Sequence, residues 1–255
     1  MRITFLGTGT SHGVPMIGCD CATCRSTDPH DARLRPSVYL ETDTAHVLID
    51  AGPDLRAQAL RFGITRVDAI LFTHGHADHI LGLDDVRRFN AIMQKPMPCY
   101  GDAHTLEDIR RTFHYVFDPA TPKGGGLPAL DLLPIKGTIR VNDLDVQPVP
   151  LWHGQRAILG FRAGRFAYLT DCNRLDDAAW AMLGGLDVLV LDALRVRAHP
   201  THFSLAEATE VAKKIGAGRT FFTHMCHDLL HASTNARLPQ GMALAHDGLI
   251  LDLPA

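Results

Sequence analysis

The sequence predicts an α/β fold in which helices cover β-sheets. Short apolar runs of strand length occur along the chain in mixed order with longer segments whose apolar residues recur at helical spacing. Such an order is typical of sheets that are covered by helices. The chain has 255 residues and is 46% hydrophobic, which is enough to bury a large core. We expect one domain that spans residues 1–255.

The strand predictions rest on apolar runs that end in turn residues or in polar side chains. The first runs lie in the N-terminal part of the chain, and the second group begins after residue 143. The predicted strands are 3–6, 38–42, 46–50, 69–73, 144–149, 157–163, 166–170, 188–192, 220–223 and 249–253.

The helix predictions rest on apolar residues that recur every three to four positions. They cover 54–62, 78–92, 104–115, 175–183 and 205–215. Segment 118–127, rich in Gly and Pro, has no periodicity and is expected to be a mobile surface loop. It does not mark a domain boundary, because candidate metal ligands lie on both sides of it.

A histidine-rich run, Thr-His-Gly-His-Ala-Asp-His at 73–79, follows the predicted strand 69–73 directly. On an extended chain His74 and His76 project to the same side. If a helix begins at Asp78, then Asp78 and His79 lie in its first turn and can point back to the same place. These are ligand types for divalent metals. One short loop could therefore hold two ions, whereas a merely solvated polar loop rarely lacks Lys and Glu.

Further candidate ligands lie where other predicted strands end. Segments 70–74 and 220–224 are both apolar strands that finish in Thr-His, so His224 is expected at the same rim as His74. These residues divide into two sets of three ligands, one set for each metal ion, and one residue that bridges the two ions. The sets are His74, His76 and His153 on one metal, and Asp78, His79 and His224 on the other, with Asp171 bridging.

Three of the six cysteines, Cys19, Cys21 and Cys24, crowd into six positions. This spacing is too tight for unstrained disulfides among them, and it is typical of thiolate ligands. Three sulfurs leave one position of a structural zinc site for a Cys or His from elsewhere in the chain. Three free thiols in a loop are the alternative. We expect the remaining cysteines, Cys99 and two others, to be small buried residues.

The charge of the chain restricts its partners. The formal net charge is −3, so there is no basic field of the kind that nucleic-acid binding needs. A small anionic substrate is still allowed, and so is a homodimer. The chain has no leader-like start and no run of about 18 apolar residues, so we expect a cytoplasmic protein without membrane contact.

The order His-x-His-x-Asp-His, His, Asp, His resembles the metallo-β-lactamase superfamily of metallohydrolases over nearly the whole chain. The resemblance implies a four-layer αβ/βα sandwich of two facing mixed sheets flanked by helices. It also implies two divalent metal ions, zinc or manganese, at the edge of the sheets. Asp50 resembles the carboxylate of the superfamily that orients the histidine loop.

The cysteine loop, which follows Gly18, resembles that of the phosphoribosyl 1,2-cyclic phosphate phosphodiesterase (PhnP-like) subfamily. In that subfamily, a histidine three residues after the late metal histidine completes a structural zinc site. Here that residue is His227. The ligands would then be Cys19, Cys21, Cys24 and His227.

The resemblance implies a metal-dependent phosphodiesterase that acts on a small cyclic or diester phosphate, with 5-phosphoribosyl 1,2-cyclic phosphate as the best match. Two divalent ions, less the charges of Asp78, Asp171 and a hydroxide, would leave roughly one positive charge toward the substrate, which favours an anionic ester. The nucleophile would be a metal-bridging hydroxide. We expect Asp78, as a metal ligand, and His202 to be catalytic.

His202 is expected to be the general acid because the subfamily places its acid in segment 199–204, and alignment on the helix that begins near Ser204 favours this residue. His199 is the alternative. Arg195 and Arg197 could contact phosphate. Other activities stay open, namely an RNA-processing nuclease or a thioesterase of the superfamily, a cofactor-biosynthesis oxidoreductase with the same cysteine loop, or a zinc-stabilised binding protein.

Overall fold

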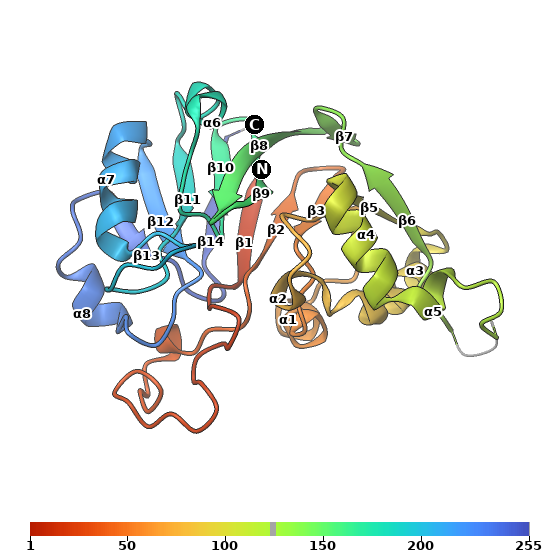
Figure 1. Cartoon of the computed structure of the whole chain (residues 1–255), viewed down its shortest axis with the longest axis horizontal. Helices are drawn as coiled ribbons and strands as arrows, with labels where there is room; N and C mark the ends of the chain where they lie inside the picture. Colours follow the sequence, from red (N-terminus) through yellow and green to blue (C-terminus); the bar gives the residue numbers. More distant parts are fainter. Residues whose placement is uncertain (123–125, 255) are drawn as a thin grey trace.

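The computed structural model of the chain describes residues 1–122 and 126–254. It contains two facing sheets of seven strands each, and helices cover the outer face of each sheet (Figure 1). The predicted four-layer α/β sandwich is therefore confirmed. None of the helices in the described residues is both long and apolar enough to span a membrane.

The first sheet has the order β14-β1-β2-β3-β4-β5-β6. Strand β1 pairs antiparallel with β14 and β2, and β2 pairs antiparallel with β3, whereas β3 to β6 run parallel. The strands are β1 (Arg2–Gly7), β2 (Ser37–Glu41), β3 (His46–Ile49), β4 (Ala69–Leu71), β5 (Met97–Gly101), β6 (Leu130–Pro134) and β14 (Ile250–Asp252).

The second sheet has the order β13-β12-β11-β10-β9-β8-β7. Its strands β10 to β13 are parallel, and β7 to β10 are joined antiparallel. The strands are β7 (Ile139–Val141), β8 (Leu144–His153), β9 (Arg156–Ala163), β10 (Phe166–Leu169), β11 (Val188–Asp192), β12 (Arg219–Thr223) and β13 (Met242–Leu244).

The helices divide between the two outer faces. Helices α1 to α5 pack on the first sheet, and α6 and α7 pack on the second. They are α1 (Leu55–Phe62), α2 (Ala77–Ile80), α3 (Val86–Met93), α4 (Ala103–Thr112), α5 (His114–Phe117), α6 (Asp177–Ala181), α7 (Leu205–Ile215) and α8 (His231–Asn235), with short 3-10 helices η1 (Pro29–Asp31) and η2 (Leu83–Asp85).

Three apolar clusters hold the four layers together. Alternate side chains of one strand enter different clusters, as in β2, where Val38 and Leu40 face the second sheet and Tyr39 faces the helices. In β11, Val190 likewise faces the first sheet and Leu191 faces α6 and α7. Because both faces of these strands are buried, their sequences are continuously apolar.

The predicted helix 78–92 is wrong as one element, since the structure divides it into α2, η2 and α3. Gly82 explains the break. Its N–H donates to the carbonyl of Ala51 at 2.8 Å, not within the helix. A Cβ at this position would lie 2.1 Å from the carbonyl oxygen of Gly52, so the backbones approach too closely for any other residue.

The predicted helix 104–115 is also divided, between α4 and α5, and the sequence analysis missed four strands and α8. The missed strands β5 and β6 contain Pro98 and Pro134, which weaken the strand signal. Of the predicted mobile loop 118–127, residues 123–125 lie outside the described residues.

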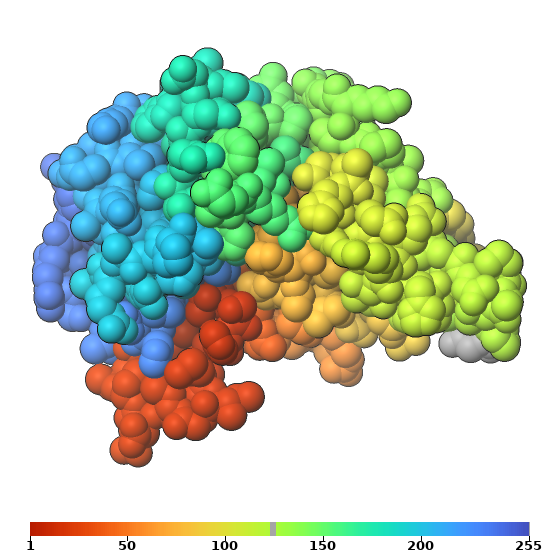
Figure 2. Space-filling model, in the orientation of Figure 1, coloured from red at the N-terminus to blue at the C-terminus, as the bar shows by residue number. Residues whose placement is uncertain are grey.

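The chain between β1 and β2 forms a lobe that protrudes from the body (Figures 1 and 2, red). This lobe carries the three clustered cysteines. On the body, the carboxyl ends of β8, β10, β11 and β12 lie at one edge of the second sheet, because these strands run in the same direction. The histidine-rich loop follows β4 in the facing sheet.

Candidate metal centre

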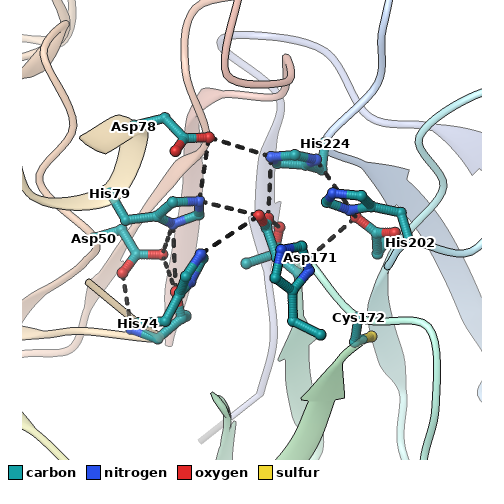
Figure 3. A network of polar contacts seen from close by, with 12 residues as sticks. Asp50, His74, Asp78, His79, Asp171, Cys172, His202 and His224 are labelled. Atoms are coloured by element: carbon teal, nitrogen blue, oxygen red, sulfur yellow. Dashed lines mark hydrogen bonds and ion pairs between the residues drawn. The ribbon is translucent and has the colours of Figure 1, made fainter. Parts of the chain in front are cut away.

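Side chains from both sheets converge on Asp171, which follows β10 (Figure 3). His224, after β12, places Nε2 3.0 Å from Asp171 Oδ1. His79, in α2, places Nε2 3.4 Å from Asp171 Oδ2. Asp78 Oδ2 lies 3.5 Å from the Nε2 atoms of both His79 and His224. These four buried residues offer ligand atoms that all lie within 4.8 Å of one another.

A second group shares the same carboxylate. His74, His76 and Asp171 also offer ligand atoms within 4.8 Å of one another, and His74 Nε2 lies 3.7 Å from Asp171 Oδ2. The ring of His153, the last residue of β8, lies 5.2 Å from that of His76 between centroids. The structure thus places all seven predicted residues together, with Asp171 in both groups. Their role as metal ligands stays a prediction.

The hydrogen bonds of the imidazoles fit metal ligation. His79 Nδ1 donates to Asp50 Oδ2 at 2.7 Å, which leaves Nε2 as the free nitrogen. Thr73 Oγ1 donates to the same carboxylate at 2.8 Å and lies 3.1 Å from His74 Nδ1. The Nε2 atoms of His74 and His79 are buried and have no hydrogen-bond partner. Buried unpaired nitrogens that face carboxylates fit a divalent cation, and Asp50 orients the histidine loop as predicted.

Opposite charges keep the carboxylate of Asp171 ionised. Burial raises the pKa of Asp171, but the imidazoles of His224 and His79 lower it by more, so its pKa lies well below the ordinary range. Burial lowers the pKa of His79, yet Asp171, Asp50 and Asp78 together raise it well above the ordinary value. The carboxylates are therefore ionised and ready to bind a cation, whereas His79 has to release its Nε2 proton to the solvent before it can ligate one.

The backbone is left-handed at three residues of the site. Asp50, Asp171 and His224 have φ values of 62°, 56° and 60°. Each of them closes or follows a strand, and residues other than glycine seldom adopt this conformation. Strain of this kind tends to occur at functional sites. The left-handed turns direct these side chains toward the rim between the sheets.

Asp192, which the sequence analysis missed, supports both His202 and Asp171. Its Oδ1 lies 3.3 Å from His202 Nδ1, and it accepts the N–H of Asp171 at 3.1 Å and the N–H of Phe203 through Oδ2 at 3.1 Å. Asp192 is the last residue of β11, which lies beside β10. An acidic residue at the end of an apolar strand was the signal by which the sequence could have shown it. Burial lowers the pKa of His202, so the imidazole is neutral at neutral pH.

The three cysteines of the lobe form a second candidate metal site with His227, and all four residues are partly exposed. Nδ1 of His227 lies 3.1 Å from the Sγ of Cys19, 3.3 Å from that of Cys21 and 3.7 Å from that of Cys24. A hydrogen bond from the Cys24 backbone lowers the pKa of the Cys21 thiol to about 6, whereas burial raises that of Cys24 to about 11. The predicted fourth residue therefore lies beside the three sulfurs, in a set that suits tetrahedral zinc.

The remaining cysteines are free thiols outside this set. Cys99 and Cys172 are buried as predicted, but the prediction is wrong for Cys226, which is only half-buried. The Sγ of Cys226 accepts the N–H of Asp228 at 3.4 Å. Cys226 therefore serves the loop beside His227, not the thiolate group.

Buried Arg33 connects the lobe to the segment that carries His224 and His227. Its guanidinium donates to the carbonyls of Cys226 at 2.8 Å and Leu229 at 2.5 Å. The chain on the other side of His224 is also held, since Met225 exchanges backbone hydrogen bonds with Thr8 and Thr10. The cysteine group is thus coupled in structure to one residue of the metal centre.

A cavity of about 300 Å³ opens between His202 and His227 of the cysteine group. Its lining includes His202, the preceding basic residues Arg195, Arg197 and His199, and one carboxylate, that of Asp228. Arg195 is held by the carbonyls of Arg197 and Ala198, at 3.2 and 3.0 Å. The walls of this cavity suit a small anion.

Comparison with known proteins shows related sequences. The model of the "Beta-lactamase superfamily domain" matches residues 45–225. The chain is 38% identical over 254 residues to an octanoyltransferase of Porphyromonas gingivalis, in a match that covers 98% of this chain and 51% of that protein. It thus spans about half the length of that relative. It is 26% identical to coenzyme PQQ synthesis protein B of Methylobacterium sp. (strain 4-46), with 99% and 100% covered.

Solved structures of other proteins also superpose on this chain. A structure described as a new diphosphatase from the PhnP family superposes with a TM-score of 0.93 and 47% identity, covering 99% of this chain and 98% of that one. Zinc-bound PqqB from Methylobacterium extorquens has a TM-score of 0.78 at 23% identity, with 99% and 100% covered. The second likeness shows the fold alone.

Replacing the shared carboxylate, Asp171→Ala, should remove a ligand from both groups at once. We expect lower occupancy at both positions and a loss of activity of more than about 100-fold, larger than the effect of losing a residue that only supports a ligand. Metal content by plasma mass spectrometry is the measurement, with exposed Asp177→Ala on α6 as the control. Full occupancy of both positions in Asp171→Ala would contradict the assignment of the bridge.

Cys21→Ser should affect stability more than chemistry, since three thiolates and an imidazole leave no open position at the cysteine group. A loss of about 4 kcal/mol would lower Tm by about 8–16 °C in a chain of this size. Cys226→Ser changes a residue on the neighbouring loop outside the group, and this variant should keep zinc bound at the cysteine group. A Cys21→Ser variant that melts like the wild type but has no activity would place this group in catalysis.

Proposed function

The chain belongs to the β-lactamase superfamily, and we propose on this basis that it is a metal-dependent phosphodiesterase. The proposed substrate is a small cyclic or diester phosphate, with 5-phosphoribosyl 1,2-cyclic phosphate as the first candidate. One observation carries the proposal, namely that the buried carboxylate of Asp171 is shared by several ligand groups, among them the group with Asp78, His79 and His224 and the group with His74 and His76. A shared carboxylate of this kind is suited to a two-metal site.

His74, His76, His153, Asp171, Asp78, His79 and His224 would hold two divalent ions. Ions bound there would lower the pKa of water and polarise phosphoryl oxygens. The protein itself supplies the orientation of these side chains. Asp50 and Thr73 fix the histidine loop, and Asp192 supports the turn at Asp171.

In this proposal His202 protonates the leaving oxygen. Its ring stacks on that of His224 with centroids 4.9 Å apart, and its Nδ1 faces Asp192, so Nε2 is the nitrogen free for a substrate. Asp192 fixes the orientation of the ring. His199, whose centroid lies 5.0 Å from that of His202, is the alternative acid.

The cavity beside His202 supports a small anionic substrate. Its volume of about 300 Å³ lies at the lower end for ligand pockets, and Arg195 and Arg197 line it. The similarity to a PhnP-family diphosphatase at 47% identity also supports chemistry at phosphorus. A role in cofactor biosynthesis is the competing hypothesis, because the match to coenzyme PQQ synthesis protein B covers the full length of that relative.

A substrate panel tests the proposal directly. The purified protein, loaded with manganese or with zinc, should hydrolyse cyclic phosphates and diesters faster than phosphomonoesters and thioesters. A diphosphate belongs in the same panel, in view of the diphosphatase relative. Turnover of the thioester alone, or of none of these compounds with a full complement of metal, would overturn the proposal.

The role of His202 is tested by changing the basicity of the leaving group. A positioned general acid contributes about 10²- to 10⁴-fold, and an alkoxide needs it more than a nitrophenolate does. His202→Ala should therefore lose about 10²-fold or more on an alkyl diester and much less on a nitrophenyl diester. His199→Ala is the matched control and should affect both substrates little.

The pH dependence of kcat/KM is a second test of His202 as the general acid. Because burial lowers the pKa of His202, its protonated form is depleted as pH rises above that pKa, and kcat/KM for the alkyl diester should fall there. His202→Ala should lose this limb and keep its metal. An equal loss on both esters, or a loss of metal, would show that His202 positions the substrate or a ligand.

A further inference from the structure

A three-histidine cluster, formed by His30, His231 and His246, lies outside the metal centre. The rings of His30 and His231 are stacked with centroids 4.7 Å apart. Those of His30 and His246 meet edge to face at 4.3 Å, and those of His231 and His246 lie 5.7 Å apart. We propose that this cluster binds one divalent transition-metal ion, with zinc as the expected occupant. Nothing in the proposed hydrolysis uses it.

The fold brings the cluster together from three segments, of which the first lies far from the other two in the sequence. His30 belongs to η1 in the protruding lobe, His231 begins α8, and His246 follows β13. The N–H of His231 donates to Asp31 Oδ1 at 2.8 Å, which fixes α8 against the lobe. A metal ion here would tie the lobe to the C-terminal part of the chain.

The hydrogen bonds leave one nitrogen of each ring available. His30 Nδ1 donates to Asp28 Oδ1 at 2.8 Å, and His246 Nδ1 lies 3.4 Å from the carbonyl oxygen of Asp247, so Nε2 is free in both rings. In His231, Nδ1 is buried and has no hydrogen-bond partner. Histidine ligands often donate their second nitrogen to a carboxylate or carbonyl, as His30 and His246 do here.

Burial of His231 and His246 favours their neutral, ligating form. Burial, followed by the neighbouring His30 and His246, lowers the pKa of His231 to about 4. Burial also lowers the pKa of His246. Arg33 acts in the same direction on His231, and Asp28 opposes it. Protons therefore compete weakly with a metal for His231 and His246 at neutral pH, and Asp28 supplies a nearby negative charge.

Binding requires a modest movement of the rings. The three histidines do not form one of the groups whose ligand atoms all lie within 4.8 Å of one another, whereas zinc needs nitrogens at about 2.0–2.1 Å. All three side chains are partly exposed, so rotation about the Cβ–Cγ bond and entry of an ion from solvent are open to them. Water can complete a tetrahedral set.

Calorimetric titration tests the proposal on the protein as it exists, with the cysteine group and the centre at Asp171 already saturated. Zn²⁺ alone is the probe. The wild type should take up one further equivalent, and His231→Gln and His246→Gln should each weaken that step at least about tenfold. His114→Gln changes an exposed histidine on α5 and should leave it unchanged. Activity should be the same in all four proteins.

A second measurement identifies the ligands. One equivalent of Cu²⁺ added to the same saturated protein should give an electron paramagnetic resonance spectrum with nitrogen hyperfine splitting, which His231→Gln reduces. Failure of the wild type to bind a further equivalent would overturn the proposal. So would binding that both the His231→Gln and His246→Gln variants retain with wild-type affinity while their circular dichroism shows them folded.

Discussion

The contact of Asp171 with imidazoles from both sheets is the interaction on which the site depends. His74 and His79 come from the first sheet, and Asp171 and His224 come from the second, so the two halves of the sandwich meet at one buried carboxylate. Burial alone would favour the neutral acid, but the surrounding imidazoles reverse this preference. Such a concentration of ligating groups in a buried place is stable only if the charges are paired, and a divalent cation pairs them.

The fold supplies this arrangement through strand ends. Parallel strands β10, β11 and β12 present Asp171, Asp192 and His224 at one edge, and the loop after β4 presents its histidines from the opposite sheet. The left-handed backbone at Asp171 and His224 turns each chain sharply after its strand. The apolar packing between the sheets fixes the separation of the two edges, which explains why a rigid core surrounds a site made of loops.

The sequence was sufficient for the layers and for the polar residues that follow apolar strands, because both leave local patterns. It was insufficient where long-range contacts decide. Gly82 breaks a helix through contact with Gly52, thirty positions earlier, and Asp192 supports His202 only once β10 and β11 are neighbours. His227 could be placed beside the cysteines only through the family resemblance. The His30 cluster leaves no local pattern, since His30 lies about 200 residues before His231 and His246.

The central claim is that two metal ions share Asp171. Anomalous diffraction from crystals of the metal-loaded protein, recorded above and below the absorption edge of the loaded metal, tests it most directly. The account predicts two anomalous peaks on either side of the Asp171 carboxylate, one beside His74 and His76 and the other beside Asp78 and His224. A single peak in fully loaded crystals, or two peaks of which only one lies within ligand distance of Asp171, would contradict it.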